Sequence, residues 1–154
     1  MPQHRPVEVL GVPSSIGVRE ETSFVVDQQH GPANIRQAYN ETMHGFDIVR
    51  PFSDLGDVQI KEAVGETLTS IAERVGAILA SGTVPIVLGG AHTLTLGSLR
   101  ALHANLQDYS LIYFDAHPDL MPHHEINYGS SLYYAIKEGL VRPEQIALLG
   151  IRQI

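Results

Sequence analysis

Two short runs of almost wholly apolar residues constrain the fold of this chain most strongly. They are TVPIVLGG at residues 83–90 and SLIYFDAH at residues 110–117. A strand that is apolar on both faces is typical of a parallel sheet covered by helices on both sides. The residues between the two runs repeat at helical spacing, with Leu96, Leu99, Leu102 and Leu106 on one face. A strand, a helix and a second strand in this order predict a parallel α/β arrangement.

The same alternation extends along the rest of the chain. Further strands are predicted at 7–13, within 46–58 and at 145–152, and further helices at 31–40, 66–82 and 130–141. Residues 14–30 show no clear period, so we predict a loop there. We expect residues 1–154 to form a single α/β domain, with a mainly parallel sheet between two layers of helices. Because the sequence stops in or just after a strand of the buried type, we expect this domain to lack a C-terminal part of its fold.

Composition and charge exclude several classes of protein. The 154 residues suffice for about one domain, and a 44% hydrophobic fraction is typical of a folded chain. A net charge of −7 without a basic stripe argues against nucleic-acid binding. The absence of cysteine excludes disulfides and thiolate metal sites and fits a reducing compartment. Without a signal-peptide core or an apolar stretch of membrane-spanning length, the sequence predicts a cytoplasmic protein that binds no membrane.

Polar residues follow both of the most apolar strands. His92 comes directly after Gly89, Gly90 and Ala91, and the glycines would let the backbone turn the imidazole toward the strand ends. Asp115, His117 and Asp119 occupy alternate positions, which point the same way along an extended chain. Ligands of open parallel sheets bind beyond the carboxyl ends of the strands. One imidazole and two carboxylates there predict a metal site that suits Mn²⁺, and less decisively Ni²⁺, Fe²⁺ or Zn²⁺.

Each of these residues also has a structural alternative. His92 alone would most often be a surface or capping residue, Asp115 could cap a helix, and Asp119 could hold a turn. Asp54 and Asp57 lie on either side of Gly56, a composition common in turns. For these two carboxylates we favour a structural role over a place in the crevice.

Several segments resemble the ureohydrolases, the arginase and agmatinase family. LGGAHTLTLGSLRAL is similar to the family's Gly-Gly-Asp-His-Ser segment, and FDAHPD is similar to its Asp-Ala-His-x-Asp segment. The likeness continues in LGVPSSIGV, GPANIRQA, DLGDV and LLGIR, in the right order. It covers nearly the whole chain, but roughly the first half of a typical family member. The resemblance implies a three-layer αβα fold of the arginase/deacetylase type, truncated at its C-terminal side.

The resemblance also implies roles for four residues. His92 resembles a ligand of one Mn²⁺, Asp115 the carboxylate that bridges two ions, His117 a ligand of the second ion, and Asp119 a further ligand of the first. In the family, a hydroxide shared by the two ions attacks the guanidinium carbon, and urea leaves. The implied activity is therefore a manganese-dependent hydrolysis of linear C–N bonds in a guanidino compound, agmatinase-like more than arginase-like. A homo-oligomer is implied as well, and Ni²⁺ is an alternative metal.

The sequence departs from the family pattern in three ways. The later Asp-x-Asp segment with further carboxylate ligands is not reached. Ala91 stands where many members have Asp, which removes a hydrogen bond that would orient His92. Tyr128 occupies the place of a His often assigned to proton transfer or substrate contact, and His124 in the same loop could compensate. Tyr128 and His124 are thus candidate catalytic residues beside Asp115 and His117, with an ordinary solvated loop as the alternative for His124.

These departures leave two functional hypotheses open. The chain is either a fragment or incomplete form of a guanidino hydrolase, or a non-catalytic relative that uses the same sheet for assembly or regulation. The intact Asp115, His117 and Asp119 favour the enzyme. A nucleotide-binding domain with Gly89 and Gly90 in a phosphate loop is disfavoured, because the glycine spacing fits neither the dinucleotide nor the P-loop motif.

Overall fold

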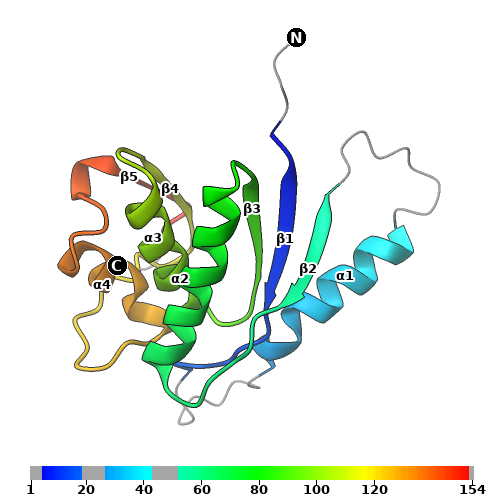
Figure 1. Ribbon diagram of the computed structural model, residues 1–154. Helices are drawn as coiled ribbons and strands as arrows, with labels where there is room; N and C mark the ends of the chain where they lie inside the picture. Colours follow the sequence, from blue (N-terminus) through cyan, green and yellow to red (C-terminus); the bar gives the residue numbers. More distant parts are fainter. Residues whose placement is uncertain (1–4, 19–26, 43–51, 153–154) are drawn as a thin grey trace.

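The computed structural model describes residues 5–18, 27–42 and 52–152 (Figure 1). Its strands are β1 (Val7–Val12), β2 (Ser53–Asp57), β3 (Val84–Gly89), β4 (Leu111–Phe114) and β5 (Ile146–Leu149). Its α-helices are α1 (Gly31–Thr42), α2 (Val64–Ala80), α3 (Leu94–Asn105) and α4 (Ser131–Lys137). Short 3-10 turns lie at η1 (Gln28–His30), η2 (Tyr128–Ser130) and η3 (Pro143–Gln145).

The predicted elements are confirmed in type and order, with shorter ends in the second half of the chain. The helix predicted over 130–141 ends at Lys137, because Gly139 adopts a left-handed φ of 72° that closes the helix. Of the extended pieces predicted within 46–58, β2 is described and 46–51 lie outside the described residues. The predicted loop at 14–30 contains η1, and 19–26 lie outside the described residues.

Every strand pairing in the described part of the chain is parallel, as predicted. The strands form one sheet in the order β2-β1-β3 and a second made of β4 and β5. The ladder between β1 and β3 runs from Val7 opposite Val84 to Val12 opposite Gly89. The ladder between β4 and β5 ends with Phe114 opposite Leu149. The carboxyl ends of β3 and β4 therefore both lead into the loops that carry the candidate site.

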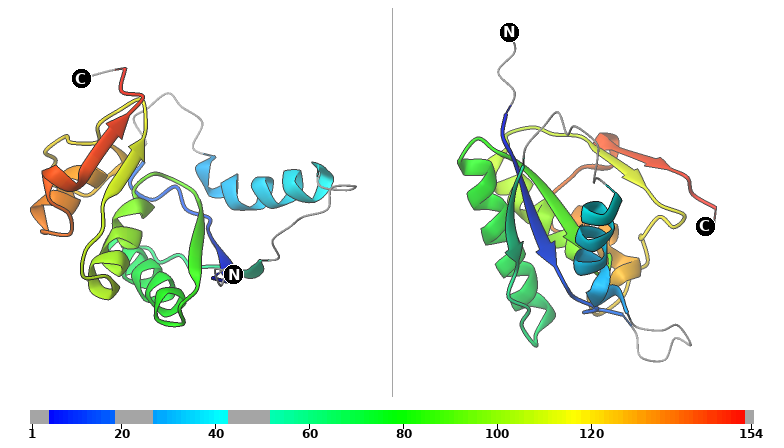
Figure 2. Two further views of the ribbon diagram at one scale, coloured as in Figure 1. Left: turned by 90° about the horizontal axis from the view of Figure 1, so that it is seen from above. Right: turned by 90° about the vertical axis from the view of Figure 1, so that its right-hand side faces the viewer.

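Helices cover both faces of the three-stranded sheet. Helices α2 and α3 lie on one face, where Leu10 and Val12 of β1 are buried against them, and α1 lies on the other (Figures 1 and 2). Val9 and Ile86 line the space beside α1. Each fully buried leucine contributes roughly 1.5–3 kcal/mol to folding. The αβα layering expected for the chain is thus present around β1 and β3.

The two faces of the β4–β5 sheet differ. Tyr113 is buried, whereas its neighbours Ile112 and Phe114 are 62% and 79% exposed. Leu149, opposite Phe114, is also exposed. Because side chains alternate along a strand, Tyr113 is directed toward the helices and away from the uncovered face. None of the described helices is long and apolar enough to cross a lipid bilayer.

An ion-pair cluster ties α1 to β2. The guanidinium of Arg36 donates from Nε to Asp54 at 2.7 Å and from another nitrogen to Asp57 at 2.6 Å. It also donates to the carbonyl of Gly56 at 3.1 Å. The hydrogen bond from Arg36, joined by one from the Gly56 N–H, lowers the pKa of Asp54 below its ordinary value. The structural role favoured for both carboxylates is confirmed, although they belong to a strand and not to a turn.

We predict that Asp54→Asn lowers the free energy of unfolding at neutral pH by roughly 0.5–1 kcal/mol, the size typical of a partly exposed ion pair. Because folding lowers the pKa of Asp54, its contribution is complete above the ordinary carboxyl value of 3.8 and is lost as pH falls through the lower folded value. Urea denaturation of both proteins across this range measures the difference, with the exposed Glu73→Gln as control. A difference that persists undiminished at about pH 2 would contradict this origin.

Candidate metal centre

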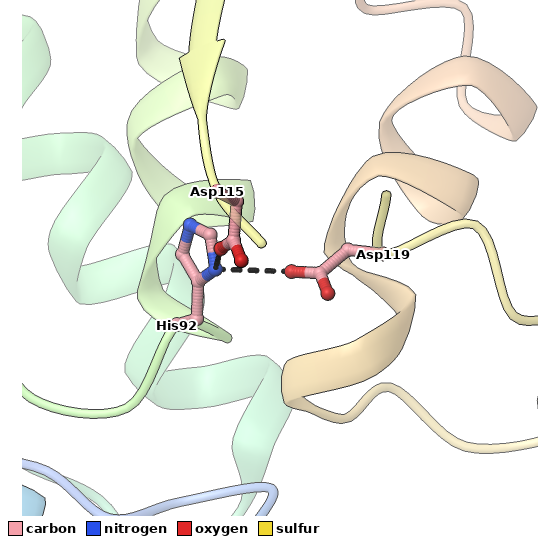
Figure 3. A group of neighbouring side chains, drawn as sticks. All are labelled: His92, Asp115 and Asp119. Carbon is pink, nitrogen blue, oxygen red and sulfur yellow. Dashed lines mark ion pairs between the residues drawn. The ribbon is translucent and has the colours of Figure 1, made fainter. Parts of the chain in front are cut away.

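The candidate site lies where β3 and β4 end. His92 belongs to the turn between β3 and α3, Asp115 directly follows β4, and Asp119 lies four residues further along the same loop, beside α4 (Figure 3). All three side chains point toward one another in this view. Strands β3 and β4 belong to different sheets, but the loops that follow their carboxyl ends meet, and this brings together residues 23 positions apart in sequence.

The three side chains offer one imidazole nitrogen and two carboxylate oxygens at close range. His92 Nδ1 lies 3.0 Å from Asp115 Oδ2 and 3.0 Å from Asp119 Oδ2. Within residues 5–18, 27–42 and 52–152, this is the one group of three or more His, Asp or Glu side chains whose ligand atoms all lie within 4.8 Å of one another. Asp119 is buried, and the other two are partly buried. The donor set suits a borderline-to-hard divalent cation such as Mn²⁺.

His117 stands beside this group without belonging to it. Its backbone N–H donates to Asp115 Oδ1 at 2.9 Å, and its Nδ1 lies 3.4 Å from the same oxygen. Its side chain is 58% exposed. Asp115 therefore directs one carboxylate oxygen toward His92 and the other toward His117. The Asp115 carboxylate thus lies between His117 on one side and the pair of His92 and Asp119 on the other.

The predicted reason for this convergence is wrong. Asp115, His117 and Asp119 do not alternate along an extended chain, because β4 ends at Phe114. The bond from the His117 N–H to the Asp115 carboxylate turns the chain, and Asp119 adopts a left-handed φ of 48°. Aspartate tolerates this conformation better than most residues. A hydrogen bond of 3.0 Å from Tyr133 N to the Asp119 carbonyl holds it in place. A local turn thus brings Asp119 back to His92.

Backbone contacts fix the position of His92. Gly90 has a φ of 21°, and a Cβ atom there would lie 2.5 Å from the Val12 carbonyl and 2.6 Å from the Ser14 carbonyl. The next residue, Ala91, donates its N–H to Ser14 O at 2.7 Å. On the other side, the hydroxyl of Ser131 donates to the His92 carbonyl at 3.1 Å. The close approach requires glycine at position 90, in line with the turn expected before His92.

The carboxylates make the site favourable for a cation. Burial alone would lower the pKa of His92, but the hydrogen bond and charge of Asp119, joined by those of Asp115, outweigh it and raise this pKa. The site thus favours a positive charge at Nδ1. A divalent cation competes with a proton for such a position, because both require the same nitrogen lone pair and the same two carboxylates.

The two remaining candidate catalytic residues lie outside the group. His124 lines a hollow together with His123, Glu125 and Tyr134. Tyr128 begins η2, is partly exposed, and its N–H donates to Gly17 O at 3.4 Å. Among the described residues, no hydrogen bond or ion pair joins the side chain of His124 or Tyr128 to His92, Asp115 or Asp119. Their catalytic roles stay predictions.

One residue of the site was missed from the sequence. Tyr113 was predicted only as part of a buried strand, yet its hydroxyl donates to Asp119 Oδ2 at 2.9 Å. The available signal was its place in the sequence, because residue 113 lies two positions before Asp115 in the same predicted strand at 110–117. Ala91, by contrast, is buried, and its side chain has no polar atom that could orient His92.

Fold and site together define an α/β protein with an imidazole–carboxylate group, placed beyond the carboxyl ends of β3 and β4, that could hold a metal ion. Residues 5–154 match the family model of the arginase family, so the chain belongs to this family. This confirms the resemblance inferred from the two polar segments that follow β3 and β4.

Named relatives agree with this assignment. The chain is 32% identical to a guanidinobutyrase from Pseudomonas aeruginosa, over 93% of this chain and 47% of that protein. It is 34% identical to an agmatinase from Chromobacterium violaceum, over 95% of this chain and 48% of the relative. A crystal structure of a hypothetical agmatinase from Burkholderia thailandensis superposes with a TM-score of 0.81 at 30% identity, over 97% of this chain and 50% of that one. The chain spans about half the length of the curated relatives it matches.

We predict that Gly90→Ala lowers the free energy of unfolding by roughly 2 kcal/mol, because the new methyl group would collide with two backbone carbonyls. Gly65→Ala is the matched control. Gly65 lies in α2 with open space around the position of a Cβ atom, so alanine there should leave stability unchanged or raise it. Urea denaturation measures both. Equal stabilities of the two variants would contradict the proposed packing at Gly90.

Proposed function

We propose that this chain supplies the metal centre of a binuclear manganese-dependent hydrolase that cleaves a linear C–N bond of a guanidino compound and releases urea. The observation that carries the proposal is the convergence of His92, Asp115 and Asp119, with the second oxygen of Asp115 directed at His117. The names of the relatives, guanidinobutyrase and agmatinase, support a guanidino substrate.

The proposed division of ligands follows the geometry. His92, Asp115 and Asp119 would bind one ion, and Asp115 and His117 would supply two of the ligands of a second ion. Oxygen and imidazole ligands without thiolate fit Mn²⁺, with Ni²⁺ as an alternative. Two such ions, when bound, lower the pKa of a water molecule and polarise the substrate at neutral pH.

The chain's own residues would do the rest. The carboxylates of Asp115 and Asp119 would offset part of the charge of the bound ions. His124 lies in a loop that lines a hollow, and its imidazole would transfer a proton to a leaving amine. Tyr128 would contact the substrate in the place the family gives to a histidine. We further propose a cytoplasmic homo-oligomer.

The ligand set is small for two divalent cations. Four side chains leave most positions around two ions to water or to further carboxylates. We therefore propose that the chain acts as a fragment or incomplete form of the enzyme. The alternative is a non-catalytic relative used for assembly or regulation, which Ala91 and Tyr128 favour and the intact cluster of His92, Asp115 and Asp119 disfavours.

Metal stoichiometry at equilibrium tests the proposed centre. After dialysis against Mn²⁺, we expect the parent chain to hold close to two ions, His117→Ala close to one, and Asp115→Ala none, because Asp115 serves both positions. Glu144→Ala, an exposed carboxylate in η3, should behave as the parent does. Elemental analysis of protein and dialysate gives the values. A parent chain without bound metal would contradict the proposal.

Urea release separates the enzyme from the non-catalytic alternative. We expect the Mn²⁺-loaded chain to release urea from agmatine or guanidinobutyrate faster than from arginine, and Asp115→Ala to release none. A colorimetric urea assay over these compounds measures the rates. Bound Mn²⁺ without urea from any of them would contradict an active chain and would support the non-catalytic relative or an incomplete form that needs further ligands.

A further inference from the structure

We propose that Tyr113 is a positioning residue of this metal centre, with its hydroxyl orienting the Asp119 carboxylate and its ring holding the His92 imidazole. The proposal rests on the proposed function, because it concerns how two of the proposed ligands are held. In this proposal Tyr113 does not bind the ion itself but contacts two side chains that would bind it.

The contacts of Tyr113 reach two of the three ligand candidates. Its hydroxyl donates to Asp119 Oδ2 at 2.9 Å, the same oxygen that lies 3.0 Å from His92 Nδ1. The hydroxyl oxygen also lies 3.4 Å from His92 Nδ1. The phenol ring stacks on the imidazole, with centroids 5.1 Å apart and 20° between the ring planes. One side chain therefore constrains both the carboxylate and the ring that would share an ion.

Tyr113 is itself held rigidly. It lies in β4, paired with Leu148 of β5, and it is 5% exposed. Its neighbours on the strand point to the opposite face, so the ring is enclosed between the sheet and the helices. The phenol thus serves as a fixed donor.

A fixed donor is useful at Asp119 for a specific reason. The backbone of this residue is in the left-handed region, and its carboxylate lies next to that of Asp115. Without this donor, the Asp119 carboxylate loses one of the two contacts that hold it at Nδ1, and its side chain can turn away. A carboxylate oxygen has more than one lone pair, so Oδ2 can accept from Tyr113 and still bind a cation. Groups that orient metal ligands in this way typically change metal affinity by about 10–100-fold.

Metal affinity in single tyrosine variants tests the role. We expect Tyr113→Phe to weaken Mn²⁺ binding about 10-fold or more in a chelator-competition titration. Tyr113→Leu, which also removes the stacked ring, should weaken it further. Tyr109→Phe is the matched control, because the Tyr109 hydroxyl also donates a hydrogen bond, to the Leu140 carbonyl outside the site. This control should keep the parent's affinity. Parent affinity in Tyr113→Phe, or an equal loss in Tyr109→Phe, would overturn the proposal.

A second measurement separates this proposal from the proposed function. Crystal structures of the metal-free parent and of Tyr113→Phe show the position of the Asp119 carboxylate directly. We expect it beside His92 Nδ1 in the parent and turned away in the variant. If the parent binds no Mn²⁺, the proposed function fails, and these structures alone decide the role of Tyr113. An unchanged Asp119 side chain in Tyr113→Phe would overturn it.

Discussion

The structure around the strand ends depends on one arrangement, the imidazole nitrogen of His92 between two carboxylates. Asp115 and Asp119 each approach Nδ1 to 3.0 Å, and a positive charge at this nitrogen stabilises both carboxylates. A proton on His92 would supply such a charge, and a divalent ion would supply more of it. The neighbouring contacts hold these three groups in register, as expected of a site whose ligands must be pre-positioned.

Those contacts come from elements far apart in the sequence. The turn at Gly90 packs against the carbonyls of Val12 and Ser14 at the end of β1. At the start of α4, the Ser131 hydroxyl donates a hydrogen bond to the His92 carbonyl, and the Tyr133 N–H donates one to the Asp119 carbonyl. Tyr113, between these points, contacts both Asp119 and His92. The site is therefore a consequence of how β1, β3, β4 and α4 pack. A substitution that disturbs this packing would weaken the centre without touching a ligand.

Much of the fold and part of the site could be predicted from the sequence. The apolar runs that became β3 and β4 predict parallel strands, which are confirmed. The burial on both faces that this pattern predicts is not met in β4, where Ile112 and Phe114 are exposed. The place of His92 and Asp115 follows from the ends of those strands. The division into two sheets could not be predicted, because the local sequence pattern does not show which strands pair with each other. The left-handed turn at Asp119 and the role of Tyr113 were also missed, because a buried tyrosine in a strand looks like any other core residue. The metal roles themselves came from family resemblance and not from spacing.

The central claim is that His92, Asp115 and Asp119 bind one cation together. Anomalous scattering from a Mn²⁺-soaked crystal of the chain tests it most directly. The account predicts an anomalous peak at bonding distance, about 2.0–2.3 Å, from His92 Nδ1, Asp115 Oδ2 and Asp119 Oδ2 at once. A peak bound to other residues, or an intact His92–carboxylate cluster with no peak at saturating Mn²⁺, would contradict it.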